Sequence, residues 1–177
     1  MNYHKIEKTS VANGTGIRVV LWISGCSLHC RGCHNPETWD LDSGKQFDEE
    51  AKNKLFVALN KPYIQGITFS GGHPLEPENV EPIYLLFKEI KEKFPTKNIW
   101  LYTGYTWEYI FPSVVTDDFN LDRFYRQEIV KMCDVVVDGP YIEEQRDITL
   151  KFRGSKNQRL IDVKETLKQN KIITIQN

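Results

Sequence analysis

Residues 17–33, IRVVLWISGCSLHCRGC, join a continuous apolar run to three closely spaced cysteines. The run up to Ile23 is rich in β-branched residues, which is typical of a strand that is buried on both faces in a parallel sheet. Cys26, Cys30 and Cys33 follow in the pattern C-x-x-x-C-x-x-C. The segment therefore predicts a buried strand that delivers three thiols to one loop.

Three thiols in one loop indicate a metal centre, because thiolate is a soft ligand that suits zinc, copper(I) and iron-sulfur clusters. A cubane cluster takes one cysteine per iron, so three cysteines leave one iron open for chemistry. A structural zinc ion normally takes four protein ligands, and His29 or His34 would then complete the set. The spacing alone leaves both centres open. Cys133 lies far downstream and is typical of a small buried apolar residue.

Strand-like and helix-like stretches alternate along the rest of the chain. Further strands are predicted at 66–70, 98–103 and 134–138, each with glycine close behind it. Helices are predicted at 48–60, 77–94, 107–110 and 121–132. Two edge strands, at 160–163 and 171–175, are predicted with a helical turn between them. This alternation is typical of right-handed βαβ units around a parallel sheet.

Ligand sites in such folds gather at the carboxyl ends of the strands. The strand ends of this chain carry the cysteine loop, Gly71-Gly72, Thr103-Gly104 and Asp138-Gly139. We therefore expect the functional site to lie there.

Composition restricts the classes of partner. The 177 residues, 40% hydrophobic and 27% charged, fit a single globular domain spanning residues 1–177. A formal net charge of -1, with acidic and basic residues interleaved, predicts neither a nucleic-acid nor a membrane partner. No apolar run is long enough to span a bilayer, and the N-terminus lacks the pattern of a secretory leader. We therefore expect a cytoplasmic protein without disulfides.

The cysteine triple and the glycine pair resemble those of the radical S-adenosylmethionine enzymes. Within that superfamily the chain is similar to the glycyl-radical activating proteins of anaerobic ribonucleoside-triphosphate reductases. The more specific phrases are YTGYTWE at 102–108 and RGSKNQR at 153–159. The others are GTGIRVVLWISGC at 14–26, GCHNPETWD at 32–40, SGGHPLEPEN at 70–79 and VVVDGPY at 135–141. The resemblance implies an α/β fold, a shortened partial (β/α)6 barrel with parallel strands.

The resemblance also implies cofactors. Cys26, Cys30 and Cys33 would hold one 4Fe-4S cluster whose open iron binds the amino and carboxylate groups of S-adenosyl-L-methionine. Gly32 and His34, which flank Cys33, would lie under the adenine. No further catalytic residue is implied, because the radical chemistry belongs to the cluster and the cofactor.

Gly71 and Gly72 match the glycine pair of the superfamily, where the backbone meets the methionine amino group at close range. The next position is usually acidic in the superfamily, and here it is His73, which offers no negative charge. Backbone carbonyls, or a neutral ring nitrogen of His73, would then contact the amino group. Thr103 and Asp138 are candidates for contacts to the ribose or the sulfonium. A helix cap and a turn explain them equally well.

The implied activity is reductive cleavage of S-adenosyl-L-methionine, followed by formation of a glycyl radical on the large subunit of the anaerobic reductase. Flavodoxin or ferredoxin is the implied electron donor. Trp39, Trp107 and Tyr109 are predicted contacts with the reductase. Two other interpretations stay open: a small radical enzyme that acts on a metabolite, and a zinc-binding interaction module. No role is predicted for the basic segment 153–159.

Overall fold

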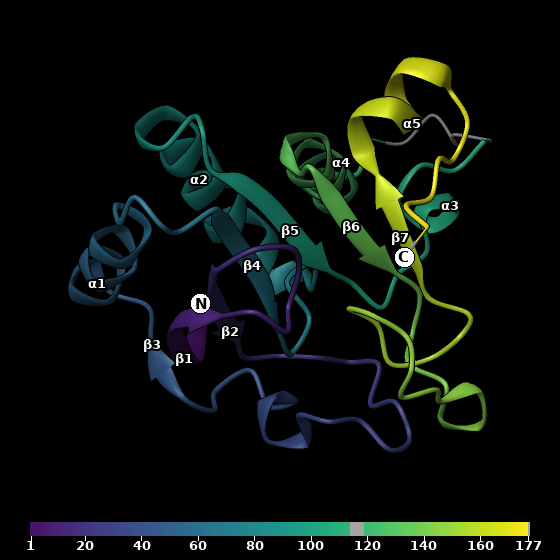
Figure 1. Cartoon of the computed structure of the whole chain (residues 1–177). Helices are drawn as coiled ribbons and strands as arrows, with labels where there is room; N and C mark the ends of the chain where they lie inside the picture. The colour runs from purple at the N-terminus through teal and green to yellow at the C-terminus, as the bar shows by residue number, and fades with distance from the viewer. Residues whose placement is uncertain (114–118, 177) are drawn as a thin grey trace.

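The computed structural model describes residues 1–113 and 119–176, which form one sheet with helices packed against it (Figure 1). The strands are β1 (Asn2–Ser10), β2 (Arg18–Ile23), β3 (Lys45–Gln46), β4 (Gly66–Gly71), β5 (Asn98–Tyr102), β6 (Val135–Asp138) and β7 (Arg159–Asp162). The helices are α1 (Glu49–Leu59), α2 (Pro77–Lys93), α3 (Trp107–Ile110), α4 (Leu121–Met132) and α5 (Val163–Gln169), with 3-10 turns η1 (Pro36–Thr38) and η2 (Glu143–Gln145). None of these helices is both long and apolar enough to cross a membrane.

The strand order is β3-β1-β2-β4-β5-β6-β7, and the four central strands β2, β4, β5 and β6 are parallel. This arrangement confirms the predicted α/β fold with a parallel centre. The predicted parallel strands form the centre of the sheet, whereas at both edges β1, β3 and β7 run antiparallel to their neighbours. The connection 11–17 between β1 and β2 is too short for the crossover helix that a parallel pair needs. Among the described residues the sheet stays open, so the partial barrel remains a prediction.

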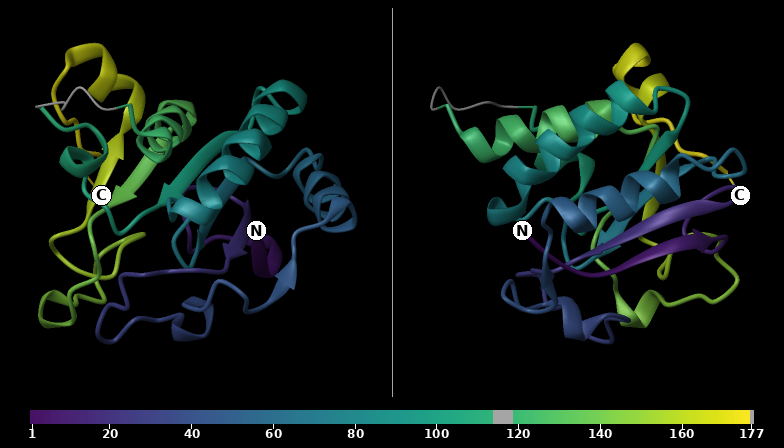
Figure 2. Two further views of the ribbon diagram at one scale, coloured as in Figure 1. Left: turned by 180° about the vertical axis from the view of Figure 1, so that it is seen from behind. Right: turned by 90° about the vertical axis from the view of Figure 1, so that its left-hand side faces the viewer.

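Helices α1, α2 and α4 cover one face of the sheet (Figure 2). Successive side chains of a strand point to opposite faces, so every second residue of the central strands faces these helices. Leu21, Phe69, Leu101 and Val136 pack there in the main core. The ring of Phe69 lies 4.4 Å from that of Phe87 in α2.

Loops cover the opposite face. The intervening strand residues Trp100, Val135 and Val137 form a second, smaller apolar cluster there with Leu160. Phe152, from the long connection between β6 and β7, packs edge-on against Trp100 with 5.4 Å between ring centroids. The loops on this face include residues that line the cavity at the carboxyl ends of the central strands.

The C-terminal segment differs from expectation. The predicted edge strand at 171–175 is wrong: the structure shows only an isolated bridge between Ile161 and Thr174. The helical turn predicted before it is the helix α5. Asp162 starts this helix directly after β7, because its Oδ1 accepts a hydrogen bond from Glu165 N at 3.0 Å.

Candidate functional site

A cavity of about 400 Å³ lies at the carboxyl ends of the central parallel strands, a volume typical of small-molecule sites. The cysteine loop after β2 and the glycine pair at the end of β4 form part of its wall. The residues after β5 and the connection between β6 and β7 complete the wall. The cavity therefore lies at the strand ends, where the site is expected.

Cys26, Cys30 and Cys33 are half-buried free thiols, and all three line this cavity. The loop turns tightly, with Cys33 N donating a hydrogen bond to Cys30 O at 3.1 Å. Burial raises the pKa of Cys26, although backbone N–H groups in the loop oppose this shift. The structure thus brings the three predicted ligands together.

The donor set fits a cluster better than a single ion. Among residues 1–113 and 119–176, no three His, Cys, Asp or Glu side chains form a group that would hold one metal ion. Of the two histidines of the zinc interpretation, His29 packs its ring 4.6 Å from that of Trp39, and His34, which lines the cavity, has its ring 5.4 Å from that of Tyr141. A cubane cluster binds each thiolate at a different iron, so its sulfurs stand farther apart than those around one ion.

Backbone hydrogen bonds fix the start of the cysteine loop from two sides. Gly25 O accepts from His73 N at 2.6 Å, which ties the loop to the glycine-pair side of the cavity. Gly25 N donates to Thr38 O at 2.8 Å, and Cys26 N donates to Trp39 O at 2.9 Å. The segment that contains η1 therefore also holds the start of the cysteine loop in place.

The glycine pair permits this close approach. Gly71 has φ +101°, and a Cβ on it would lie 2.6 Å from Ile23 N. A Cβ on Gly72 would lie 2.5 Å from Gly25 O. Both glycines are thus needed for the strand end to meet the cysteine loop, whatever they contact in a cofactor. Gly32 also has a left-handed φ of +71°, but it is exposed and does not line the cavity.

His73 lines the cavity but is only 1% exposed. Its Nδ1 lies 2.9 Å from Glu76 Oε1, and its Nε2 lies 2.8 Å from Thr103 Oγ1. Burial lowers the pKa of His73, and Glu76 offsets this only in part, so the ring is neutral. An ionised carboxylate only accepts hydrogen bonds. Nδ1 therefore donates to Glu76, and Nε2 accepts from the Thr103 hydroxyl.

Both ring nitrogens of His73 are thus already engaged within the protein. The predicted contact between a ring nitrogen of His73 and an amino group would have to break one of these hydrogen bonds. Thr103 lines the cavity, and its hydroxyl also accepts from Tyr105 N at 3.1 Å. It caps no described helix, because the cap of α3 is Thr106.

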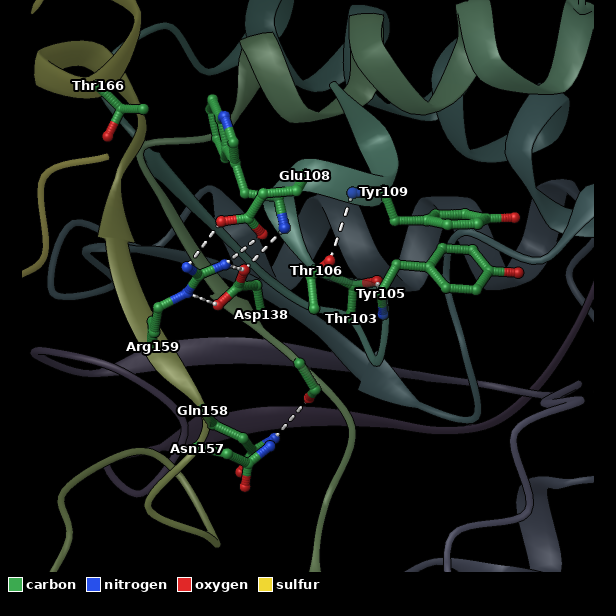
Figure 3. A network of polar contacts seen from close by, with 12 residues as sticks. Thr103, Tyr105, Thr106, Glu108, Tyr109, Asp138, Asn157, Gln158, Arg159 and Thr166 are labelled. Atoms are coloured by element: carbon green, nitrogen blue, oxygen red, sulfur yellow. Dashed lines mark hydrogen bonds and ion pairs between the residues drawn. The ribbon is translucent and has the colours of Figure 1, made fainter. Parts of the chain in front are cut away.

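Asp138 is fully buried and is not among the residues that line the cavity. It lies beside Arg159 in a network of polar contacts (Figure 3). Arg159 Nε donates to Asp138 Oδ1 at 2.9 Å, and the terminal nitrogens of Arg159 donate to the Glu108 carboxylate at 3.0 and 2.8 Å. Asp138 Oδ2 also accepts from Trp107 N at 2.8 Å. Asp138 therefore joins β6, β7 and α3, which is a structural role.

This network predicts a pH-dependent contribution to stability. Hydrogen bonds from Arg159 lower the pKa of Glu108 from 4.5 to about 2. A carboxyl group whose pKa is lower in the folded state stabilises the fold above its unfolded pKa and loses this effect as the pH falls towards its folded pKa. We expect Glu108→Gln to lower the urea midpoint at pH 7 and to do so much less at pH 3. An equal difference at both pH values would contradict this assignment.

The three aromatic residues predicted to contact a partner have different environments. Trp107 is 8% exposed and stacks on Phe111 with 4.6 Å between centroids, so the prediction of a surface contact is wrong for it. Trp39 is half-buried and lines the cavity. Tyr109 is 55% exposed, and its predicted contact stays a prediction.

Sequence reasoning missed two site residues. Glu76, next to His73 in space, lies in a charged segment that is typical of a solvated helix start. Arg153 lies in the polar segment 153–159 and lines the cavity. It is the only Asp, Glu, Lys or Arg among the described lining residues, and its Nε–H is buried without a hydrogen-bond partner.

Comparisons with known proteins place the chain in a family. A family model described as a 4Fe-4S single cluster domain matches residues 12–161. The chain is similar to proteins named anaerobic ribonucleoside-triphosphate reductase-activating protein from several sources. It is 38% identical over 160 residues to that of Vibrio cholerae, covering 89% of this chain and 96% of the relative. For Enterobacteria phage T4 the identity is 41%, covering 90% and 93%, and for Escherichia coli K12 it is 37%, covering 89% and 96%.

Proposed function

Because the chain belongs to the family of anaerobic ribonucleoside-triphosphate reductase-activating proteins, we propose that it forms a glycyl radical on the large subunit of such a reductase by reductive cleavage of S-adenosyl-L-methionine. The observation that carries the proposal is that three free cysteines and the glycine pair line one cavity. Cys26, Cys30 and Cys33 would hold a 4Fe-4S cluster, which would supply the electron that breaks the bond between sulfur and the 5′ carbon of the cofactor with release of methionine, and the glycine of the reductase would provide the hydrogen atom. The chain's own residues would bind and orient the cofactor.

The cavity wall suggests how the cofactor would be oriented. Backbone groups at Gly71 and Gly72 would meet the methionine amino group, since the ring of His73 is engaged elsewhere. His34 lines the cavity with Tyr141 beside it and would lie against the adenine. Gly32 would serve the adenine only indirectly, by allowing the left-handed turn between two cysteines.

Arg153 would bind the carboxylate of the cofactor, because it is the one residue with a fixed charge among the described lining residues. Its unpartnered Nε–H supports this role, since a buried donor without an acceptor is costly. We expect Arg153→Gln to weaken binding of S-adenosyl-L-methionine by about 10-fold or more, which is the usual effect of losing a charged hydrogen bond.

The matched ligand is decarboxylated S-adenosylmethionine, and the matched protein control is Lys151→Gln, which alters an exposed residue nearby. Binding of the decarboxylated ligand should be unchanged by Arg153→Gln, and Lys151→Gln should bind both ligands as the wild type does. Equal weakening of both ligands by Arg153→Gln would show that the arginine does not read the carboxylate.

The proposal extends to the surroundings of the site. The sheet would be a shortened partial (β/α)6 barrel within one activase domain, residues 1–177. The reductase would close the cavity from its open side, with exposed Tyr109 at the contact. The electron would come from flavodoxin or ferredoxin in the cytoplasm.

Low-temperature electron paramagnetic resonance on anaerobically reconstituted protein tests the proposed function. We expect a reduced-cluster signal that changes with S-adenosyl-L-methionine and a stable glycyl doublet after the reductase is added. A colourless, zinc-containing protein would exclude the proposal. A cluster that responds to the cofactor but forms no glycyl radical would favour an enzyme that acts on a metabolite.

A further inference from the structure

We infer that Glu76 is a positioning residue, a buried carboxylate that fixes the cysteine loop to the glycine-pair wall of the cavity and places a negative charge behind the cluster ligands. This inference rests on the proposed function, because it takes the cavity to hold the cluster. Glu76 itself does not line the cavity. It would act through Ser27 and His73.

One oxygen of Glu76 joins the two walls. Oε1 accepts hydrogen bonds from Ser27 N, Ser27 Oγ and His73 Nδ1, each at 2.9 Å. Ser27 directly follows Cys26 in the sequence, and His73 directly follows the glycine pair. Glu76 is buried, with 4% of the residue exposed. Glu76 therefore bridges the first cluster ligand and the end of β4.

The hydrogen-bond chain continues to the next strand. His73 Nε2 accepts from the Thr103 hydroxyl at 2.8 Å, and Thr103 Oγ1 accepts from Tyr105 N at 3.1 Å. Every donor in this chain has an acceptor, and such chains strengthen each member by polarisation. These hydrogen bonds thus link three segments of the cavity wall: the cysteine loop, the end of β4 and the residues that follow β5.

The carboxylate is ionised at neutral pH. Burial alone would raise the pKa of Glu76, but hydrogen bonds from His73 and Ser27 outweigh it and bring the pKa to about 2. Arg126 is the nearby cation, and its Nε donates to Leu75 O at 2.9 Å. His73 is neutral, so the partners of the carboxylate are dipoles.

A fixed negative charge beside a cluster disfavours addition of an electron, because net charge and hydrogen bonding set cluster potentials. The negative charge of Glu76 also contributes to the raised pKa of Cys26. Removal of the charge should therefore make the cluster easier to reduce. Once reduced, the cluster without this charge should also be a weaker reductant towards the cofactor.

The test is a redox titration of the reconstituted holoprotein followed by electron paramagnetic resonance. Glu76→Gln keeps the size and the acceptor oxygen but removes the charge. We expect its cluster midpoint potential to shift upwards, with a lower yield of glycyl radical on the reductase. Ser27→Ala, which removes one of the three donors, should shift the potential by a smaller amount or not at all, because the charge stays.

Glu78→Gln is the matched control, since it removes the same charge from an exposed site in the first turn of α2, the helix that Glu76 directly precedes. Its potential should equal that of the wild type. A folded Glu76→Gln protein that binds less iron would also support the inference, because the loop would have lost its anchor. An unchanged potential with unchanged iron content, even with a lower melting temperature, would overturn it.

The wild-type protein in the same experiment separates the two hypotheses. A wild type that forms the glycyl radical, beside a Glu76→Gln variant with wild-type iron content and potential, overturns only the positioning role. A wild type without a reducible cluster overturns the proposed function and, with it, this inference.

Discussion

Replacing Cys30 with alanine is expected to abolish assembly of the cluster and all formation of glycyl radical. Cys30 is the middle member of the three thiols that line the cavity, and the described residues offer no fourth cysteine nearby to replace it. A cluster that loses one of three protein ligands has a second exposed iron and is lost from the protein. Iron and sulfide content, measured after anaerobic reconstitution, would reveal this directly.

Cys133→Ala is the control for the loss of a thiol as such. Cys133 is 1% exposed and its Sγ donates to Ile129 O at 3.3 Å, while burial raises its pKa well above the ordinary value. It is a packing residue, so its replacement should lower stability by on the order of 1 kcal/mol and leave iron content unchanged. A Cys30→Ala protein with full iron content and a normal spectrum would show that the ligand assignment is wrong.

The central strands were predictable because each is a continuous apolar run that pairs within the interior of a parallel sheet. β2 and β6 are examples, since almost all of their residues are buried. β1 was not predicted. It is an edge region with the sequence NYHKIEKTS, in which only Ser10 is buried. Neither a two-residue period nor an apolar run marks such a strand, because its stability comes from pairing with β2.

The site, too, has residues that the sequence predicted and residues that it did not. The cysteines and the glycine pair are local motifs, so their spacing predicts a shared loop and a tight turn before any fold is known. Glu76 and Arg153 have no such signal. Glu76 is buried where it binds Ser27 and His73, two residues far apart in the sequence. Arg153 reaches the cavity because the long connection between β6 and β7 carries it there. Polar residues of this kind look like surface residues until tertiary contacts are known.

Gly71→Ala is expected to destabilise the protein far more than the same change at another left-handed glycine. Gly71 and Gly139 have similar φ values, +101° and +90°, so alanine should cost about 1–2 kcal/mol at either position from backbone conformation alone. Their surroundings differ. A Cβ at Gly71 would lie 2.6 Å from Ile23 N, a backbone atom, whereas the nearest atom at Gly139 is 3.5 Å away on the Asn157 side chain.

The close approach at Gly71 should therefore add about 1–3 kcal/mol, the usual cost of overpacking. The clash also has a direction, because it pushes the end of β4 away from Ile23 and the chain that leads into the cysteine loop. Urea unfolding of the two alanine variants measures the difference, and iron content reports whether the loop still binds a cluster. Equal loss of stability in both variants would mean that the strand end can move without cost. The glycine pair would then matter for its contact with the cofactor rather than for bringing β4 against the cysteine loop.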